Sequence, residues 1–77
     1  MKGLIALPFG TNREIQNRIA VLRAERKLSQ KELANALGVS RQTIISLEKN
    51  RYNPSLRLAF EVALFFETDL VNVFQYE

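Results

Sequence analysis

Hydrophobic residues recur every three or four positions through the middle of the chain, which is the period of an α-helix. Between Gln30 and Lys49 this pattern runs twice, with a short break between the runs. The apolar positions that it places on one inward side are Leu33, Leu37, Val39, Ile44 and Leu47. Ala34 leaves room for the second helix to cross the first closely. The pattern therefore predicts two short packed helices joined by a tight turn.

Capping residues mark the boundaries of both helices. Ser29 precedes the first helix and Glu32 follows three residues later, which together make a capping box. Gly38 stands just past the end of this helix, where a left-handed backbone is wanted and glycine adopts it without a steric penalty. Ser40 precedes the second helix as its N-cap. The turn between the helices is therefore confined to a few residues.

The first helix of the chain has two competing starts. Thr11 and Glu14 form a capping box that would begin the helix immediately after Thr11. Asn17 is also a good N-cap, and with this cap the helix would begin at Arg18. With either start, Ile19 and Leu22 face the core, because they are spaced by three residues.

A loop over Asn50 to Pro54 separates the central helix pair from a more apolar helix. Ser55 caps this helix, about Leu56 to Phe66. Its expected inward stripe is Leu56, Ala59, Val62, Ala63 and Phe66. The apolar residues left on its other faces are Leu58, Phe60, Leu64 and Phe65. This is more apolar surface than a monomer of this size should expose. Thr68 is then expected to cap a last short helix, Asp69 to Val73.

The two ends of the chain carry less regular patterns. Phe74 to Glu77 is expected to be extended. Met1 to Gly10 contains an apolar run, Leu4 to Leu7, that fits a short strand, an arm clasping a partner, or a leader. The residues leave that choice open. We divide the chain into an arm or leader over 1–16 and a domain over 17–77.

Composition excludes several function classes. Seventy-seven residues allow one small domain, near the size at which a single core gives marginal stability. The chain has no cysteine and no histidine, which argues against a disulfide scaffold, a metal site and the catalysis that depends on either. No nucleophile has a base beside it, so we expect no enzyme activity and no cofactor. No apolar run approaches the about 20 residues of a membrane span, so a cytoplasmic protein without a membrane partner is expected.

Charge is distributed unevenly along the chain. The net charge is only +3, but all eleven basic residues lie within residues 1–57, against four acids there. The last twenty residues carry four acids and no base. A basic body with an acidic end fits a surface that faces a polyanion on one side and serves another task on the other.

The outward side of the second helix in the central pair is polar. Its residues are Arg41, Gln42, Thr43 and Ser46. Arginine can pair with guanine O6 and N7 through two hydrogen bonds, and glutamine can do so with adenine N6 and N7. This row therefore predicts contacts with base edges in a DNA major groove.

Further polar residues lie at the ends of the central helices. Gln30 begins the first helix, where free backbone N–H groups favour an anion such as phosphate. The residues at the two ends of the second helix are Ser40, Lys49, Asn50, Arg51 and Tyr52. Together they are expected to contact the DNA backbone on both sides of the groove.

Three strings of the sequence resemble the Xre/Cro/C1 family of helix-turn-helix repressors from bacteria and phages. They are LSQKELANALGVSRQTI, LEKNRYNPSL and the closing VNVFQYE, and the resemblance spans Asn17 to Tyr76. It implies an all-α, compact five-helix, lambda-repressor-like domain. In short members the residues before the first helix run extended and pair with the C-terminal segment, which favours the Asn17 start and a small two-stranded pairing.

The resemblance also implies roles for particular residues. Family members read bases at the positions of Arg41 and Gln42 and contact phosphate through the glutamine at Gln30. They also carry a partly buried ion pair between the first and third helices, at the positions of Arg23 and Glu48. Such a pair is better evidence for geometry than for stability.

We therefore expect a homodimeric transcriptional repressor that binds a roughly palindromic double-stranded DNA operator. A small-molecule effector is not expected. The expected dimer interface is the C-terminal set Leu64, Phe65, Leu70, Val71 and Tyr76. Two alternatives remain: an antitoxin or restriction-modification controller of the same fold, and a module that binds only proteins. Steep weakening of binding by salt would favour the DNA-binding interpretations.

Overall fold

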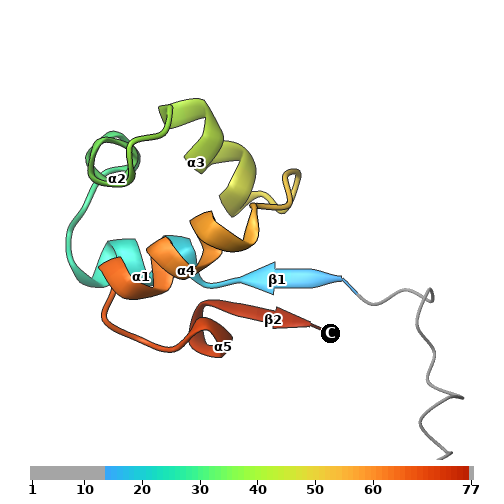
Figure 1. The fold of residues 1–77 in the computed structure, drawn as a ribbon. Coiled ribbons are helices and arrows are strands. Elements are labelled where there is room, and N and C mark those ends of the chain that lie inside the picture. Colours follow the sequence, from blue (N-terminus) through green and yellow to red (C-terminus); the bar gives the residue numbers. More distant parts are fainter. Residues whose placement is uncertain (1–13, 77) are drawn as a thin grey trace, which may run out of the picture.

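The computed structural model describes residues 14–76. These residues form five helices and two short strands (Figure 1). In chain order the elements are β1 (Ile15–Asn17), α1 (Ile19–Glu25), α2 (Gln30–Leu37), α3 (Arg41–Glu48), α4 (Leu56–Phe65), α5 (Leu70–Val73) and β2 (Phe74–Tyr76). The expected five-helix fold with one small strand pair is confirmed. The apolar run Leu4 to Leu7 lies outside the described residues.

The two strands join the beginning and the end of the domain. β1 and β2 run antiparallel, with Gln16 opposite Gln75. The pairing extends one residue further, to the N-cap of α1, because the backbone N–H of Arg18 donates to the carbonyl of Val73 at 2.9 Å. A helix starting after Thr11 is excluded, since residues 15–17 are a strand. The helix starts at Ile19, one residue later than the Asn17 cap predicts.

Four of the helices end in the same way. After α1, α2, α3 and α4 the chain passes through a residue with positive φ: Lys27, Gly38, Asn50 and Glu67. In each case the backbone N–H of the residue that follows donates a hydrogen bond to a carbonyl in the last turn of the helix. After α1, for example, the N–H of Leu28 donates to the carbonyl of Arg23 at 2.9 Å. This is the Schellman arrangement, which satisfies the terminal carbonyls and turns the chain sharply. Only the glycine at this position was predicted. Lysine and glutamate rarely adopt a left-handed backbone, and Asn50 was assigned to a loop for its turn-forming residue type without a specific backbone conformation.

The core lies where α1, α4 and α5 meet the α2–α3 pair. Its fully buried large side chains are Ile19, Leu33, Ile44, Leu47, Val62 and Val73. All the apolar residues expected on the inward side of α2 and α3 are buried or packed against this core, and Ala34 is 2% exposed at their crossing. No helix among the described residues has the length and hydrophobicity needed to cross a membrane.

The predicted inward stripe of α4 was partly wrong. Leu56 is 68% exposed, whereas Leu58, expected on another face, is buried. The reason is the four-residue spacing of the helix: Leu58 shares a row with Val62 and Phe66, both of which are buried. Leu56 instead begins a row on the opposite side.

The last helix is shorter than predicted. α5 covers Leu70–Val73, with Asp69 rather than Thr68 at the N-cap position. The Thr68 hydroxyl instead accepts a hydrogen bond from the Asn72 side chain at 3.0 Å. This contact ties the loop before α5 to the helix itself.

Candidate nucleic-acid interface

The α2–α3 pair is fixed by side-chain caps at both helix starts. The Ser29 hydroxyl accepts the N–H of Glu32 at 2.9 Å, and the Glu32 carboxylate accepts the N–H of Ser29 at 2.8 Å. This second bond lowers the pKa of Glu32, so its contribution to stability is lost as the pH falls through that lowered value. The Ser40 hydroxyl accepts the N–H of Thr43 at 3.0 Å and thereby sets the start of α3.

The polar row on α3 is accessible. Arg41 and Gln42 are exposed, and Thr43 and Ser46 are half-buried. The Gln42 amide donates to the Ser46 hydroxyl at 3.4 Å, and the hydroxyls of Thr43 and Ser40 are 2.8 Å apart. Arg41 makes no side-chain hydrogen bond to any other residue from 14 to 76. Its guanidinium therefore keeps all its donors for a ligand.

An ion pair holds the C-terminal end of α3 to α1. Arg23 donates to both carboxylate oxygens of Glu48, at 2.8 and 3.2 Å, and to the carbonyl of Leu28 at 2.9 Å. The two side chains are only 19% and 9% exposed. The hydrogen bond to Glu48 raises the pKa of Arg23. Because the carboxylate also accepts from Gln30 at 3.0 Å, one acid joins α1, α2 and α3.

The residues expected to contact phosphate have different environments. Lys49, Arg51 and Tyr52 are exposed at the C-terminal end of α3, and Ser40 is exposed at the other end. The Gln30 amide donates one hydrogen bond to Glu48, which leaves its second N–H and the N-terminal backbone of α2 accessible at the start of this helix.

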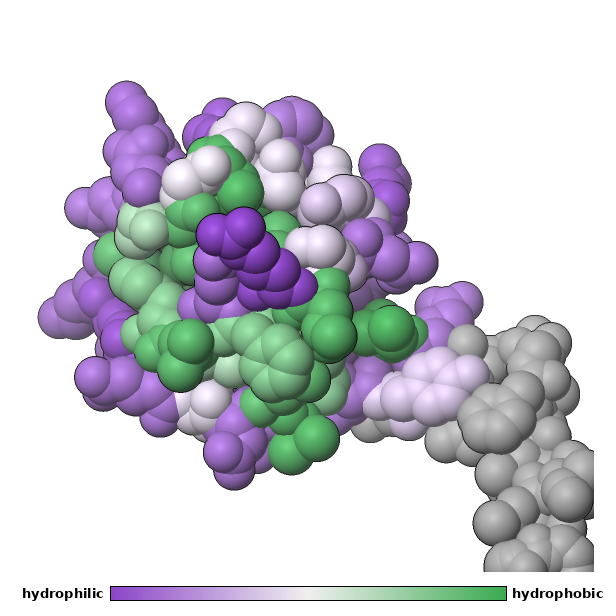
Figure 2. All heavy atoms as spheres, in the orientation of Figure 1, coloured by the Kyte–Doolittle hydropathy of each residue, from purple (hydrophilic) through white to green (hydrophobic). Residues whose placement is uncertain are grey.

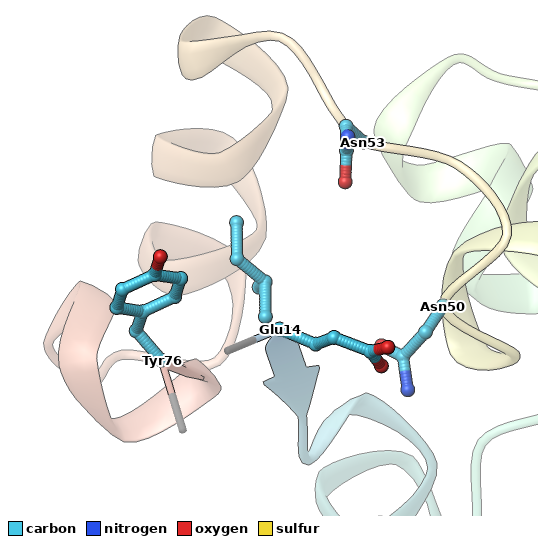
Figure 3. Close-up of a pocket in the computed structure, with 5 residues that line it drawn as sticks. Glu14, Asn50, Asn53 and Tyr76 are labelled. Carbon is cyan, nitrogen blue, oxygen red and sulfur yellow. The ribbon is translucent and has the colours of Figure 1, made fainter. Parts of the chain in front are cut away.

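The exposed Asn50 side chain is bonded to two other residues of the protein. Its amide oxygen accepts from Asn17 at 2.8 Å, and its amide nitrogen donates to Gln16 at 3.2 Å. Asn50 and Asn53 also line a hollow with Glu14 and Tyr76, in which the Glu14 carboxylate is turned toward Asn50 (Figure 3). The Glu14 carboxylate thus places a negative charge beside Asn50, whereas Lys49 and Arg51 place positive charges at the same end of α3.

Asn17 positions α3, a role that the sequence did not indicate beyond helix capping. Its side chain accepts the N–H of Ile19 at 3.0 Å and donates to the carbonyl of Leu47 at 2.9 Å. With its bond to Asn50, one amide thus joins β1, the start of α1 and the end of α3.

We expect Asn17→Ala to lower the free energy of unfolding by about 1–2 kcal/mol, because it removes three hydrogen bonds and leaves part-buried partners unmatched. Urea unfolding followed by circular dichroism measures the change. Asn72→Ala is the matched control, since Asn72 donates one exposed hydrogen bond to Thr68. Equal losses in the two variants would contradict the bridging role of Asn17.

Arg26 is a second residue that the sequence did not single out. It donates to the carbonyls of Phe65 and Phe66 at 3.2 and 2.9 Å, and its guanidinium lies 5.3 Å from the centre of the Phe66 ring. It thereby joins the C-terminal ends of α1 and α4. No local pattern reveals this contact, because the partners are about forty residues away in the sequence.

The residues expected at a dimer interface fall into two groups. Leu64, Val71 and Tyr76 are exposed, at 74%, 70% and 46%. Phe65 and Leu70 are half-buried and pack against the core. Leu64 and Val71 therefore expose most of their apolar surface, whereas Phe65 and Leu70 also support the fold.

Relatives of the chain carry the same domain. A model of the helix-turn-helix family matches residues 19–72. An HTH-type transcriptional regulator of Methanocaldococcus jannaschii is 49% identical over 63 residues, which cover 82% of this chain and 96% of that protein. The immunity repressor protein of Bacillus phage phi105 is 43% identical over 49 residues, which cover 64% of this chain and 34% of the repressor.

Solved structures share the fold. A candidate DNA-binding protein from Bacteroides fragilis superposes with a TM-score of 0.71 at 31% identity, over 79% of this chain and 98% of that one. The transcriptional regulator VanUg superposes with a TM-score of 0.73 at 22% identity, over 92% and 95% of the two chains. The matched family model spans α1 to α5, including the capped α2–α3 pair described above. The chain belongs to the Xre/Cro/C1-type helix-turn-helix family.

Proposed function

We propose that this protein is a transcriptional regulator that binds specific sequences of double-stranded DNA as a homodimer, with α3 of each copy in a major groove. The observation that carries the proposal is Arg41 at the first position of α3, which is exposed and has no side-chain partner among residues 14–76. The N-terminal residues of a recognition helix reach deepest into the groove. The Glu48 contacts hold the far end of α3 in place.

Base recognition is assigned to the polar row of α3. Arg41 pairs with a guanine through its fork of donors, and Gln42 pairs with an adenine. The bond from Gln42 to Ser46, at 3.4 Å, is long enough to be exchanged for a base contact at little cost. Thr43 and Ser46 then complete the contacts with the same half-site.

Phosphate contacts flank this row on both sides. The N-terminal backbone of α2 at Gln30 and the Ser40 hydroxyl lie before α3, and Lys49, Arg51 and Tyr52 lie after it. Asn50 takes part through the shape that it gives to the loop rather than through its amide, which is bonded to β1. Such contacts set affinity and register without reading sequence.

Arg51→Ala should weaken binding to all DNA sequences alike and reduce the slope of log K against log salt by about one unit. The reason is that Arg51 is exposed in the loop after α3 and should meet phosphate rather than a base. Fluorescence anisotropy over a salt series measures the slope.

Arg18→Ala makes the matching control, because Arg18 lies between β1 and α1 and its guanidinium contacts the Asn72 carbonyl. Its salt slope should stay at the wild-type value. An altered base preference in Arg51→Ala with the slope intact would show that Arg51 reads sequence.

Repression by occlusion of a promoter is the mode of action that we favour. The immunity repressor of phage phi105 and the RstR repressor of a cryptic CTXphi phage in Vibrio cholerae are both related to this chain, at 43% and 38% identity. Two copies related by a two-fold axis require a roughly palindromic operator with half-sites about one helical turn apart.

Selection of bound sequences from a random duplex library tests the whole proposal. A palindromic consensus supports it, whereas recovery of no consensus, together with binding that is insensitive to salt, would point to a protein-binding module instead.

A further inference from the structure

Helix α4 carries an exposed apolar row. Leu56, Phe60 and Leu64 follow one another at four-residue spacing and are 68%, 49% and 74% exposed. Figure 2 shows hydrophobic residues gathered on the side of the molecule where α4 and α5 face the viewer. The opposite face of α4 packs into the core. An apolar row of this spacing is the kind of surface through which helices pair.

We infer that α4 packs antiparallel against α4 of a second copy, about a two-fold axis that passes beside Phe60. This inference rests on the proposed homodimer and specifies its interface. The row is symmetric about its centre, so Phe60 meets its own counterpart and Leu56 faces Leu64 of the second copy. In a two-fold interface each of these contacts forms twice, apart from the central one.

The charges beside the row fit this arrangement. Arg57 and Glu61 lie on the same side of the row and form an exposed ion pair at 3.2 Å within the helix. In an antiparallel pair related by a two-fold axis, the side of α4 that carries Arg57 and Glu61 lies next to the same side of the second α4, and the two helices run in opposite directions. Arg57 then lies near Glu61 of the second copy, and Glu61 lies near Arg57. A parallel pairing would place like charges together, so these residues favour the antiparallel one.

The surface beside the row also has an apolar groove that can receive a side chain of the second copy. An apolar groove whose lining includes Ile15, Leu70 and Phe74 opens beside Leu56. In the antiparallel arrangement Leu64 of the second copy lies opposite Leu56, at this groove. Leu64 is among the most exposed apolar side chains from residues 14 to 76, so it can insert into the groove as a knob. The projection and the groove belong to the same chain, which is the requirement for self-association.

Exchange of the two charges tests the inference. Arg57→Glu places two acids on each helix and Glu61→Arg places two bases, so either variant alone should self-associate about 10-fold more weakly than the wild type. An equimolar mixture of the two should form heterodimers, and the double variant Arg57→Glu/Glu61→Arg should recover the wild-type constant. Sedimentation equilibrium measures each constant, and circular dichroism checks that the helices persist.

Cross-linking gives a second readout that does not depend on charge. The chain has no cysteine, so Phe60→Cys introduces a unique thiol beside the expected axis. A short thiol-specific cross-linker should join two copies of this variant at least 10-fold faster than two copies of Val21→Cys, whose residue is 47% exposed on α1.

Two results would overturn the inference: no recovery of self-association in the mixture and the double variant, or equal cross-linking at both positions. Operator binding by wild-type protein is measured in parallel. Specific DNA binding without charge-dependent pairing would reject this interface and leave the proposed function standing. Pairing through α4 without DNA binding would support this interface and reject the proposed function.

Discussion

Glu48→Ala should lower the free energy of unfolding by about 2–4 kcal/mol, somewhat less than for a fully buried pair because Arg23 keeps 19% of its side chain exposed. The substitution removes three hydrogen bonds to one carboxylate and leaves the guanidinium of Arg23 and the amide of Gln30 without their acceptor. A domain of this size has a stability of roughly 0.05–0.15 kcal/mol per residue, so the loss is a large share of the total. Urea unfolding followed by circular dichroism measures it.

The matched control is Glu25→Ala. Glu25 is an exposed acid at the end of α1, where a negative charge is unfavourable to the helix dipole, so its removal should change stability by less than about 0.5 kcal/mol. A double-mutant cycle with Arg23→Ala then isolates the pairwise energy. Additive effects of Arg23→Ala and Glu48→Ala would show that the pair contributes no coupling, contrary to our expectation.

The same carboxylate connects stability to function. Glu48 is the last residue of α3, and its partners lie on α1 and at the first position of α2. The contact of Gln30 with phosphate stays a prediction, and its side chain also supports this junction. We therefore expect Glu48→Ala to weaken DNA binding beyond what the loss of folded protein explains. The start of α2 and the end of α3, which we propose to contact phosphate, would lose a common support.

Features set by local interactions were predictable from the sequence. The Ser29 and Glu32 capping box, the Ser40 cap and the left-handed Gly38 all depend on residues within a few positions of one another. The strand pair was inferred only through resemblance to a family, since three residues on each strand give too short a pattern to identify alone.

Features that depend on distant contacts were missed. Asn17 looked like a helix cap, and its bond to the Leu47 carbonyl spans thirty residues. Arg26 drew no prediction, although it joins the C-terminal ends of α1 and α4. The face of α4 was misjudged at Leu56 because the apolar pattern of this helix extends around most of its circumference, so periodicity does not choose between the rows.

The residues that would touch DNA remain predictions, and Arg41 has the sharpest test. Arg41→Ala should relax the preference at one base position of each half-site and cost about 1–3 kcal/mol there. Arg41 is exposed at the start of α3 and makes no side-chain hydrogen bond to another residue from 14 to 76, so its truncation should leave the fold intact. Sequence selection compares the preferred base at each position with that of the wild type.

Arg41→Lys separates the charge from the geometry of the guanidinium. Lysine keeps the positive charge but lacks the planar fork that pairs with guanine through two bonds. The variant should therefore keep the wild-type salt slope and lose much of the preference for guanine, whereas Arg51→Ala should do the opposite. If selection recovers an unchanged consensus from both Arg41 variants, Arg41 does not read a base, and Gln42 becomes the first residue of α3 to contact the groove.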